Sequence, residues 1–129
     1  EHNDCVAMAK QFADRTHFVH LRSCYIFPNG NFTEASHLGG RGQLIELCRI
    51  FEKAEQEGKC NSGRRLPMRV DHGMTFTDEP GGVFDESNHG HNAGYTLLGR
   101  MFAMGQIQGV IATVDDELGI EYKQPGFYD

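Results

Sequence analysis

The sequence predicts an α/β fold, because segments with helical and strand-like patterns alternate along its 129 residues. Two short β-prone segments each carry apolar side chains on one face, as strands do when helices cover one side of a sheet. A segment with helical spacing of apolar residues follows each of them. Two strands are too few for a stable sheet. We therefore expect this single segment, residues 1–129, to belong to a larger α/β unit or to assemble with other copies.

The first helix is expected over residues 4–14, where apolar side chains recur at helical spacing and Asn3 or Asp4 can cap the amino-terminal end. The first strand is expected over residues 16–22, a β-prone segment flanked by polar residues. Its alternation places Phe18, His20 and Arg22 on one face, and Val19 and Leu21 on the other.

Residues 23–42 are expected to form a long loop, because they are rich in glycine and contain a Pro-Asn-Gly turn signal. Within this loop a short helical turn is expected at residues 33–37. The second helix is expected over residues 43–57 and ends at Gly58. Its apolar stripe consists of Leu44, Leu47, Cys48, Phe51 and Ala54.

The second strand is expected over residues 66–71 and ends before Gly73. Its alternation places Arg69 and Asp71 on one face of the strand. The strand therefore ends, like the first one, with polar side chains on a shared face.

A second long loop is expected over residues 74–94, followed by a third helix over residues 95–118 with a broad apolar face. Its glycines should allow the helix to pack close to a neighbour. Residues 119–129 are expected to form a tail that becomes ordered only when it docks.

The net charge of -6 argues against a nucleic-acid partner, because proteins that bind nucleic acid carry a basic surface. We count no apolar run of the roughly 20 residues that a bilayer span requires, so no membrane partner is expected. The four cysteines are widely spaced and form no Cys-x-x-Cys pair. This spacing favours reduced thiols in a cytoplasmic protein over a disulfide framework.

If the two strands are parallel neighbours, His20, Arg22, Arg69 and Asp71 meet at their carboxyl ends. This is where α/β barrels and open α/β sheets keep their active sites. Imidazole and carboxylate together suit a divalent metal ion such as Mn²⁺. The guanidinium groups can hold an acidic substrate through paired hydrogen bonds.

Two ligands are too few for a closed metal site, so others must come from outside this chain or from its loop histidines. A single loop histidine is more often hydrogen-bonded within the protein than bound to metal, and Glu34 and His37 show the Glu-x-x-His spacing of metal sites only once. Tyr95, at the start of the third helix, suits a proton donor and equally a tyrosine at the rim of a site. The candidate loop histidines are His37, His72, His89 and His91.

Four segments in this order resemble the carboxyl-terminal part of the D-mannonate dehydratase family. They are residues 17–22 (HFVHLR), 32–38 (FTEASHL), 67–73 (PMRVDHG) and 94–100 (GYTLLGR). The resemblance implies a TIM-barrel lyase that dehydrates D-mannonate to 2-keto-3-deoxy-D-gluconate in glucuronate catabolism, usually with Mn²⁺, although Fe²⁺ or another divalent metal can serve. The two strands would then be the last two of a (β/α)8 barrel, which is incomplete in this chain.

By the same resemblance, His20 and Asp71 are metal ligands and His72 and Tyr95 take part in proton transfer. The residues that would hold the sugar acid are Arg22, Arg69 and His37. Val70 stands where the family usually has proline. The family's other metal ligands, on earlier strands, are not in this sequence, so the fragment alone is expected to be inactive.

Two alternatives remain open at this point. One is another metal-dependent TIM-barrel enzyme, an isomerase or epimerase of sugars or sugar acids. The other is a non-enzymatic metal-binding or assembly module. We expect a homo-oligomer that acts on a small sugar acid.

Overall fold

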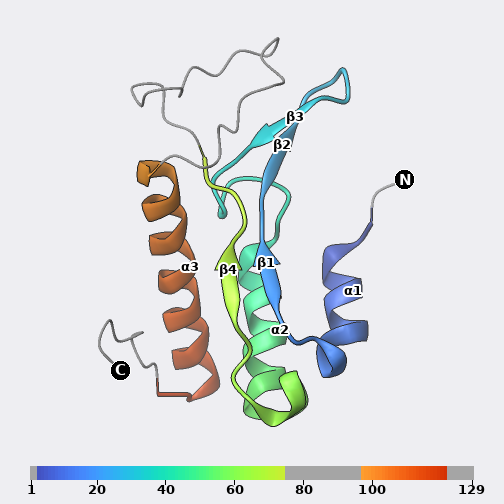
Figure 1. The fold of residues 1–129 in the computed structure, drawn as a ribbon, viewed down its shortest axis with the longest axis vertical. Helices are drawn as coiled ribbons and strands as arrows, with labels where there is room; N and C mark the ends of the chain where they lie inside the picture. The colour runs from blue at the N-terminus through green and yellow to red at the C-terminus, as the bar shows by residue number, and fades with distance from the viewer. Residues whose placement is uncertain (1–2, 75–96, 122–129) are drawn as a thin grey trace.

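The computed structural model describes residues 3–74 and 97–121 and shows a mixed α/β arrangement. In Figure 1 strands β1 and β4 lie side by side in front of helix α2, with α3 beside β4 and α1 beside β1. The elements in chain order are α1 (Cys5–Phe12), a 3-10 turn (Ala13–Arg15), β1 (Val19–Leu21), β2 (Cys24–Ile26), β3 (Phe32–Glu34), α2 (Leu44–Gln56), a second 3-10 turn (Asn61–Gly63), β4 (Met68–Val70) and α3 (Leu97–Leu118).

Strands β1 and β4 pair in parallel, which confirms the predicted relationship between the two strands. The register places His20 opposite Arg69 and Leu21 opposite Val70. Leu21 and Val70 are buried, whereas His20 and Arg69 are exposed. The alternation read from the sequence therefore separates a helix-covered face from a polar face. The strands are shorter than expected, with three residues each.

The covered face of β1 and β4 packs against α2 and α3. Fully burying a valine, leucine or isoleucine side chain contributes about 1.5–3 kcal/mol, so this layer contributes strongly to stability. The buried residues of this core are Leu21, Leu44, Cys48, Val70, Ala103, Ile107, Val110 and Val114.

The first two predicted helices, α1 and α2, are confirmed with small shifts of their ends. The side chain of Asp4 accepts a hydrogen bond from the backbone N–H of Ala7 at 2.9 Å and so caps α1. Helix α2 buries four residues of its predicted stripe, and the chain leaves it at Gly58, whose φ of +65° favours glycine. The four are Leu44, Cys48, Phe51 and Ala54.

The prediction of a loop with a helical turn at residues 33–37 is wrong. Strands β2 and β3 form an antiparallel hairpin, with Tyr25 opposite Thr33 and Cys24 opposite Glu34. The Pro-Asn-Gly segment is the hairpin connection, in which Phe27 N–H donates to the carbonyl of Asn31 at 2.8 Å. The signal was present, because two β-prone triplets flank this turn. In Figure 1 the hairpin extends beyond the carboxyl end of β1.

Helix α3 packs through one stripe and not through the broad apolar face that was expected. Leu98, Met101 and Phe102 are exposed. The buried stripe, whose members recur every three or four residues, consists of Ala103, Ile107, Val110 and Val114.

By length and composition alone, α3 could cross a membrane, which corrects the expectation that no run is long enough. The helix has 22 residues and contains a window with a mean hydropathy of 1.2, of which 28% is buried. Its buried stripe contacts α2 and β4. One stripe of α3 therefore packs on the α/β layer, while most of the apolar window is not buried among the described residues.

Gly73 explains how α3 approaches the end of β4. A Cβ atom built on Gly73 would lie 2.5 Å from the carbonyl oxygen of Gly99 in α3, a distance that requires the backbone to move. At Gly105 and Gly109 a Cβ would meet no atom within 4 Å. The expected close packing at glycine is thus found at Gly99 and not along the rest of the described helix.

Candidate functional site at the carboxyl ends of two strands

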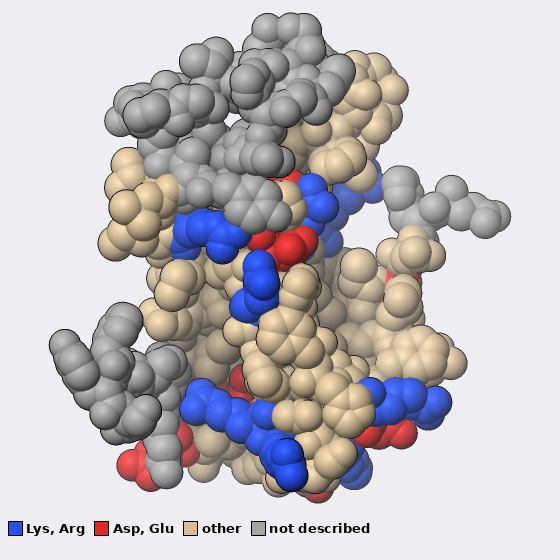
Figure 2. Space-filling model, in the orientation of Figure 1, with Lys and Arg blue, Asp and Glu red and all other residues tan. Residues whose placement is uncertain are grey.

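His20 and Asp71 come together where β1 and β4 end. Because the backbone N–H of Asp71 donates to the carbonyl of Leu21 at 3.0 Å, the parallel ladder continues one residue past β4. Nδ1 of His20 then lies 3.4 Å from Oδ1 of Asp71, and the His20 and Asp71 side chains are 47% and 26% exposed. Figure 2 shows basic and acidic side chains gathered at this level of the strands.

This donor pair fits part of a divalent metal site. Two ligands that are each about 2.1 Å from one ion are separated by roughly 3 to 3.5 Å, and the His20 to Asp71 distance is 3.4 Å. Within residues 3–74 and 97–121, no group of three or more His, Cys, Asp or Glu side chains is placed to hold a metal ion. A complete site therefore needs ligands beyond these described residues.

His72 lies between two carboxylates. Its Nε2 is 3.8 Å from Oδ2 of Asp71, and its Nδ1 is 3.6 Å from Oε1 of Glu34. The side chain is 20% exposed. His72 therefore lies beside the His20 and Asp71 pair, within ion-pair distance of both carboxylates.

Arg22 is paired with Glu34, a residue that the sequence assigned to no site. The Nε of Arg22 donates to Glu34 Oε1 at 3.0 Å and to Oε2 at 3.2 Å, and a second donor, Nη2, also contacts Oε1. The hydrogen bond with Glu34 is the main cause that raises the pKa of Arg22. The Arg22 guanidinium also lies over the ring of Phe32, 5.3 Å from its centroid.

Glu34 was missed because its position depends on the hairpin. From the sequence it stood near His37 in a loop, and the only signal for it was the weak Glu-x-x-His spacing. In the structure it belongs to β3, and its register opposite Cys24 puts it beside the start of the hairpin, close to Arg22. Recognition of the two strand triplets would have predicted this placement.

His37, which the resemblance placed at the substrate, lies in the interior. The residue is 2% exposed. Its Nε2 is 2.8 Å from the carbonyl oxygen of Leu21, and its backbone N–H donates to the side chain of Gln106 at 2.9 Å. A carbonyl can only accept, so Nε2 carries the proton in this contact. Nδ1 is buried and has no hydrogen-bond partner in the described structure.

Arg69 lies on the polar face of the sheet, opposite His20 in the register. Its Nε approaches the carbonyl of Val70 at 3.4 Å. Among the ion pairs found between described residues, none involves Arg69.

Three other predicted site residues lie outside the described ranges. They are Tyr95, His89 and His91.

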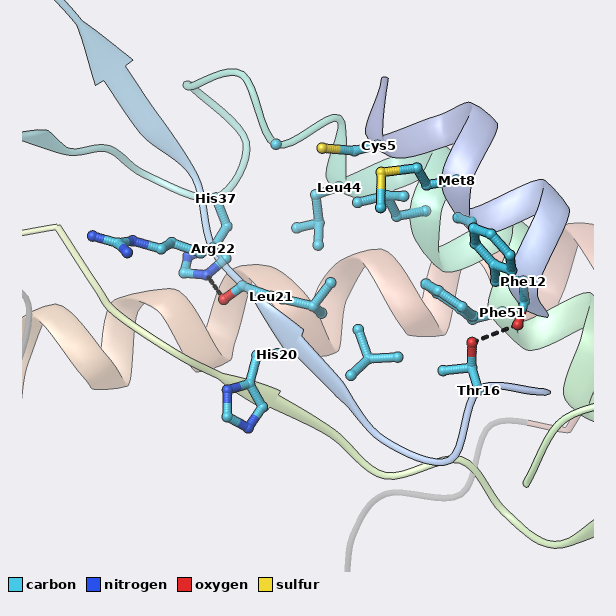
Figure 3. A pocket seen from close by; sticks show the side chains of 14 residues that line it. Cys5, Met8, Phe12, Thr16, His20, Leu21, Arg22, His37, Leu44 and Phe51 are labelled. Atoms are coloured by element: carbon cyan, nitrogen blue, oxygen red, sulfur yellow. Dashed lines mark hydrogen bonds between the residues drawn. The ribbon is translucent and has the colours of Figure 1, made fainter. Parts of the chain in front are cut away.

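A separate cavity of about 430 Å³ lies on the other side of β1, between this strand and helices α1 and α2. Figure 3 shows Met8 and Phe12 of α1 and Leu44 and Phe51 of α2 around it, while His20 extends away from these apolar side chains. Its lining is mainly apolar, and His20, Arg22 and His37 border it at the end of β1. The candidate site is the group at the strand ends.

Comparison with known proteins gives a consistent result. The family model described as D-mannonate dehydratase (UxuA) matches residues 1–120. A protein named Mannonate dehydratase 2 from Agrobacterium fabrum is 37% identical over 118 residues, which are 90% of this chain and 28% of that protein. A mannonate dehydratase from Saccharophagus degradans is 35% identical over 115 residues, covering 88% of this chain and 28% of that protein.

The chain spans little more than a quarter of the length of these relatives. Its placement at their carboxyl-terminal end stays a prediction from the four motifs. The resemblance to the family itself is confirmed, since the family model covers nearly the whole chain. The chain belongs to the D-mannonate dehydratase family.

Proposed function

We propose that this chain forms one wall of the active site of a hydro-lyase that converts D-mannonate to 2-keto-3-deoxy-D-gluconate in glucuronate catabolism. The observation that carries the proposal is the convergence of His20, Asp71 and His72 at the carboxyl ends of two parallel strands. Membership of the family, and the names of its relatives, support this choice of reaction.

The two parallel strands are proposed to be the last two of a (β/α)8 TIM barrel. Three features support this: the strands pair in parallel, helices α2 and α3 cover one face, and the other face carries the polar site residues. In a TIM barrel that polar face points to the barrel axis and the carboxyl ends form the active site. The remaining strands would come from the rest of a family-length polypeptide or from other copies.

His20 and Asp71 are the residues that would hold the metal, for which we propose Mn²⁺, with Fe²⁺ or another divalent ion as a substitute. When bound, such an ion supplies positive charge that stabilises the negative charge developing on the substrate's carboxylate. Two ligands alone bind metal weakly, so the isolated chain is proposed to be inactive.

The dehydration removes a proton from the carbon beside the carboxylate and expels a hydroxyl group from the next carbon. One group must take that proton and one must protonate the leaving oxygen. His72, at the edge of the site and 20% exposed, is placed to hold and move one of these protons. Tyr95 is proposed as the second proton-transfer group on the strength of the family motif.

The direct test joins this chain to the remainder of a family-length polypeptide, adds Mn²⁺ and D-mannonate, and measures 2-keto-3-deoxy-D-gluconate. Formation of the keto-deoxy acid is expected. An isomeric sugar acid as the product would instead identify an isomerase or epimerase. Metal binding by this chain alone, with no turnover after the remainder is restored, would identify a binding or assembly module and reject the proposal.

We further propose that the protein is a cytoplasmic homo-oligomer without nucleic-acid or membrane partners. The acidic balance of the sequence supports the exclusion of nucleic acid. The packing of α3 against α2 and β4 supports the exclusion of a membrane.

A further inference from the structure

Glu34 occupies a position at the site that its sequence context did not indicate. It lies at the end of β3, in the hairpin that extends beyond the carboxyl end of β1, and its side chain is only 10% exposed. A carboxylate this well buried is costly unless charged or hydrogen-bonding partners compensate. Its surroundings should therefore show what it is for.

The partners of Glu34 are two residues proposed for the site. Arg22 binds it through a forked contact, with Nε donating to both carboxylate oxygens at 3.0 and 3.2 Å. Nδ1 of His72 lies 3.6 Å from the same carboxylate, within ion-pair distance. The carboxylate thus links the end of β1, through Arg22, to the residue after Asp71.

This pairing limits what Arg22 can do. A guanidinium binds a carboxylate best through two adjacent N–H groups, and the Nε and Nη2 groups of Arg22 are already directed at Glu34. While the pair is intact, Arg22 cannot offer that edge to a sugar acid. His37 is likewise committed, because its ring is buried and bonded to the carbonyl of Leu21.

Arg69 differs from Arg22 in these respects. It is exposed and lies on the same face as His20, its partner in the register. Its described contact is with a backbone carbonyl of its own strand. A guanidinium with this placement can meet the carboxylate of a substrate at the His20 and Asp71 pair.

We propose that Glu34 is a positioning residue, which holds Arg22 and His72 in place. Arg69 is then the guanidinium that binds the carboxylate of the substrate. This inference rests on the proposed dehydratase function and assigns separate roles to the two arginines.

The test uses the family-length protein that contains this chain, loaded with Mn²⁺, and measures kcat and KM for D-mannonate. In Arg69→Gln, KM is expected to rise about 10-fold to 100-fold, because the variant loses one charge-assisted hydrogen-bonded pair with the substrate. The change in kcat is expected to be smaller. In Glu34→Gln, kcat is expected to fall about 10-fold to 100-fold without a rise in KM, because misplaced groups slow the chemical step. Arg22→Lys, which cannot form the fork, should show the same kcat defect.

Glu117→Gln is the matched control. It also removes an arginine partner, since Glu117 accepts from Arg49 at 2.7 and 3.1 Å, but it does so between α2 and α3, away from the strand ends. Its kinetics should equal those of the wild type. Because residues of one unit do not act additively, the double variant Arg22→Lys/Glu34→Gln should lose no more kcat than either single variant.

Inactive wild-type protein would reject the proposed function and not this assignment of roles. When the wild type is active, two results would overturn the inference. One is a kcat and KM of Glu34→Gln equal to those of Glu117→Gln, and the other is a rise in the KM of Glu34→Gln like that of Arg69→Gln. If Glu34→Gln fails to fold, Glu34→Asp replaces it, because it keeps the charge and shortens the reach by one methylene. Normal kcat in that variant would also overturn the positioning role.

Discussion

Nδ1 of His20 and Oδ1 of Asp71 lie 3.4 Å apart although they come from different strands. The parallel register of β1 and β4 creates this proximity, and the ladder bond from Asp71 N–H to the carbonyl of Leu21 fixes the height of the carboxylate. Any metal-dependent activity of this site therefore depends on the alignment of two short strands.

The first prediction concerns the metal. In the family-length protein, Asp71→Asn should weaken Mn²⁺ binding by more than about 10-fold. Substitution of a residue that only supports a metal ligand already lowers metal affinity by about 10-fold, and loss of a ligand itself should cost more. Titration calorimetry or metal content after dialysis measures it. Asp116→Asn, at an exposed position on α3, is the control and should bind like the wild type. Unchanged affinity in Asp71→Asn would remove this residue from the metal site.

The second prediction separates metal binding from proton transfer. Tyr95→Phe should keep its metal but lose about 100-fold to 10,000-fold in kcat, the usual contribution of a general acid or base. Metal content and turnover are measured on the same sample. Normal turnover of the loaded variant would show that Tyr95 is not the proton donor.

The third prediction tests the close approach of β4 and α3. Gly73→Ala should lower the free energy of unfolding by about 1–3 kcal/mol, because its Cβ would meet the backbone of Gly99 at 2.5 Å. Gly105→Ala, in α3, is the control, because a Cβ built there meets no atom within 4 Å. It should stabilise α3 by up to about 1 kcal/mol. Equal melting temperatures for the two variants would contradict the close contact.

The fourth prediction concerns pH. Burial, and then the charge of Asp115, raise the pKa of Glu52 from 4.5 to about 7. Between these values the folded protein keeps a proton that the unfolded chain releases, so the free energy of unfolding falls as pH rises through this range. The change should be about 1 kcal/mol, because partial exposure screens the charge. Urea unfolding at pH 5 and pH 8 measures it, and Glu52→Gln should reduce the difference.

The fifth prediction concerns the thiols. Cys48 is 0% exposed, and burial raises its pKa to about 12, so the thiolate needed for reaction is scarce at pH 8. Cys5 is exposed. A thiol reagent should therefore label Cys5 first and Cys48 only on unfolding, as peptide mapping would show. Early labelling of Cys48 in folded protein would mean that the core around it opens.

Much of the fold could be predicted from local patterns. Helix α2 followed from the spacing of Leu44, Cys48 and Phe51, and the polar face of β1 and β4 followed from strict alternation. The hairpin was missed because its triplets are short and its glycine-rich surroundings are typical of a loop. Of the apolar side chains of α3, the sequence could not tell which would be buried, because that depends on where the helix meets α2 and β4.

By itself, the sequence determined the α/β order and the polar face on which each strand ends, because side-chain periodicity and the end of each strand are local properties. The parallel pairing of β1 with β4, which brings His20 to Asp71, was expected from the sequence only under a condition and is set by the register. Only the tertiary structure decided the role of the hairpin. The antiparallel register of β2 and β3 brings Glu34 to Arg22 and His72 and leaves Arg69 on the polar face. Contacts between residues far apart in the chain are set by packing and register, which no local pattern contains.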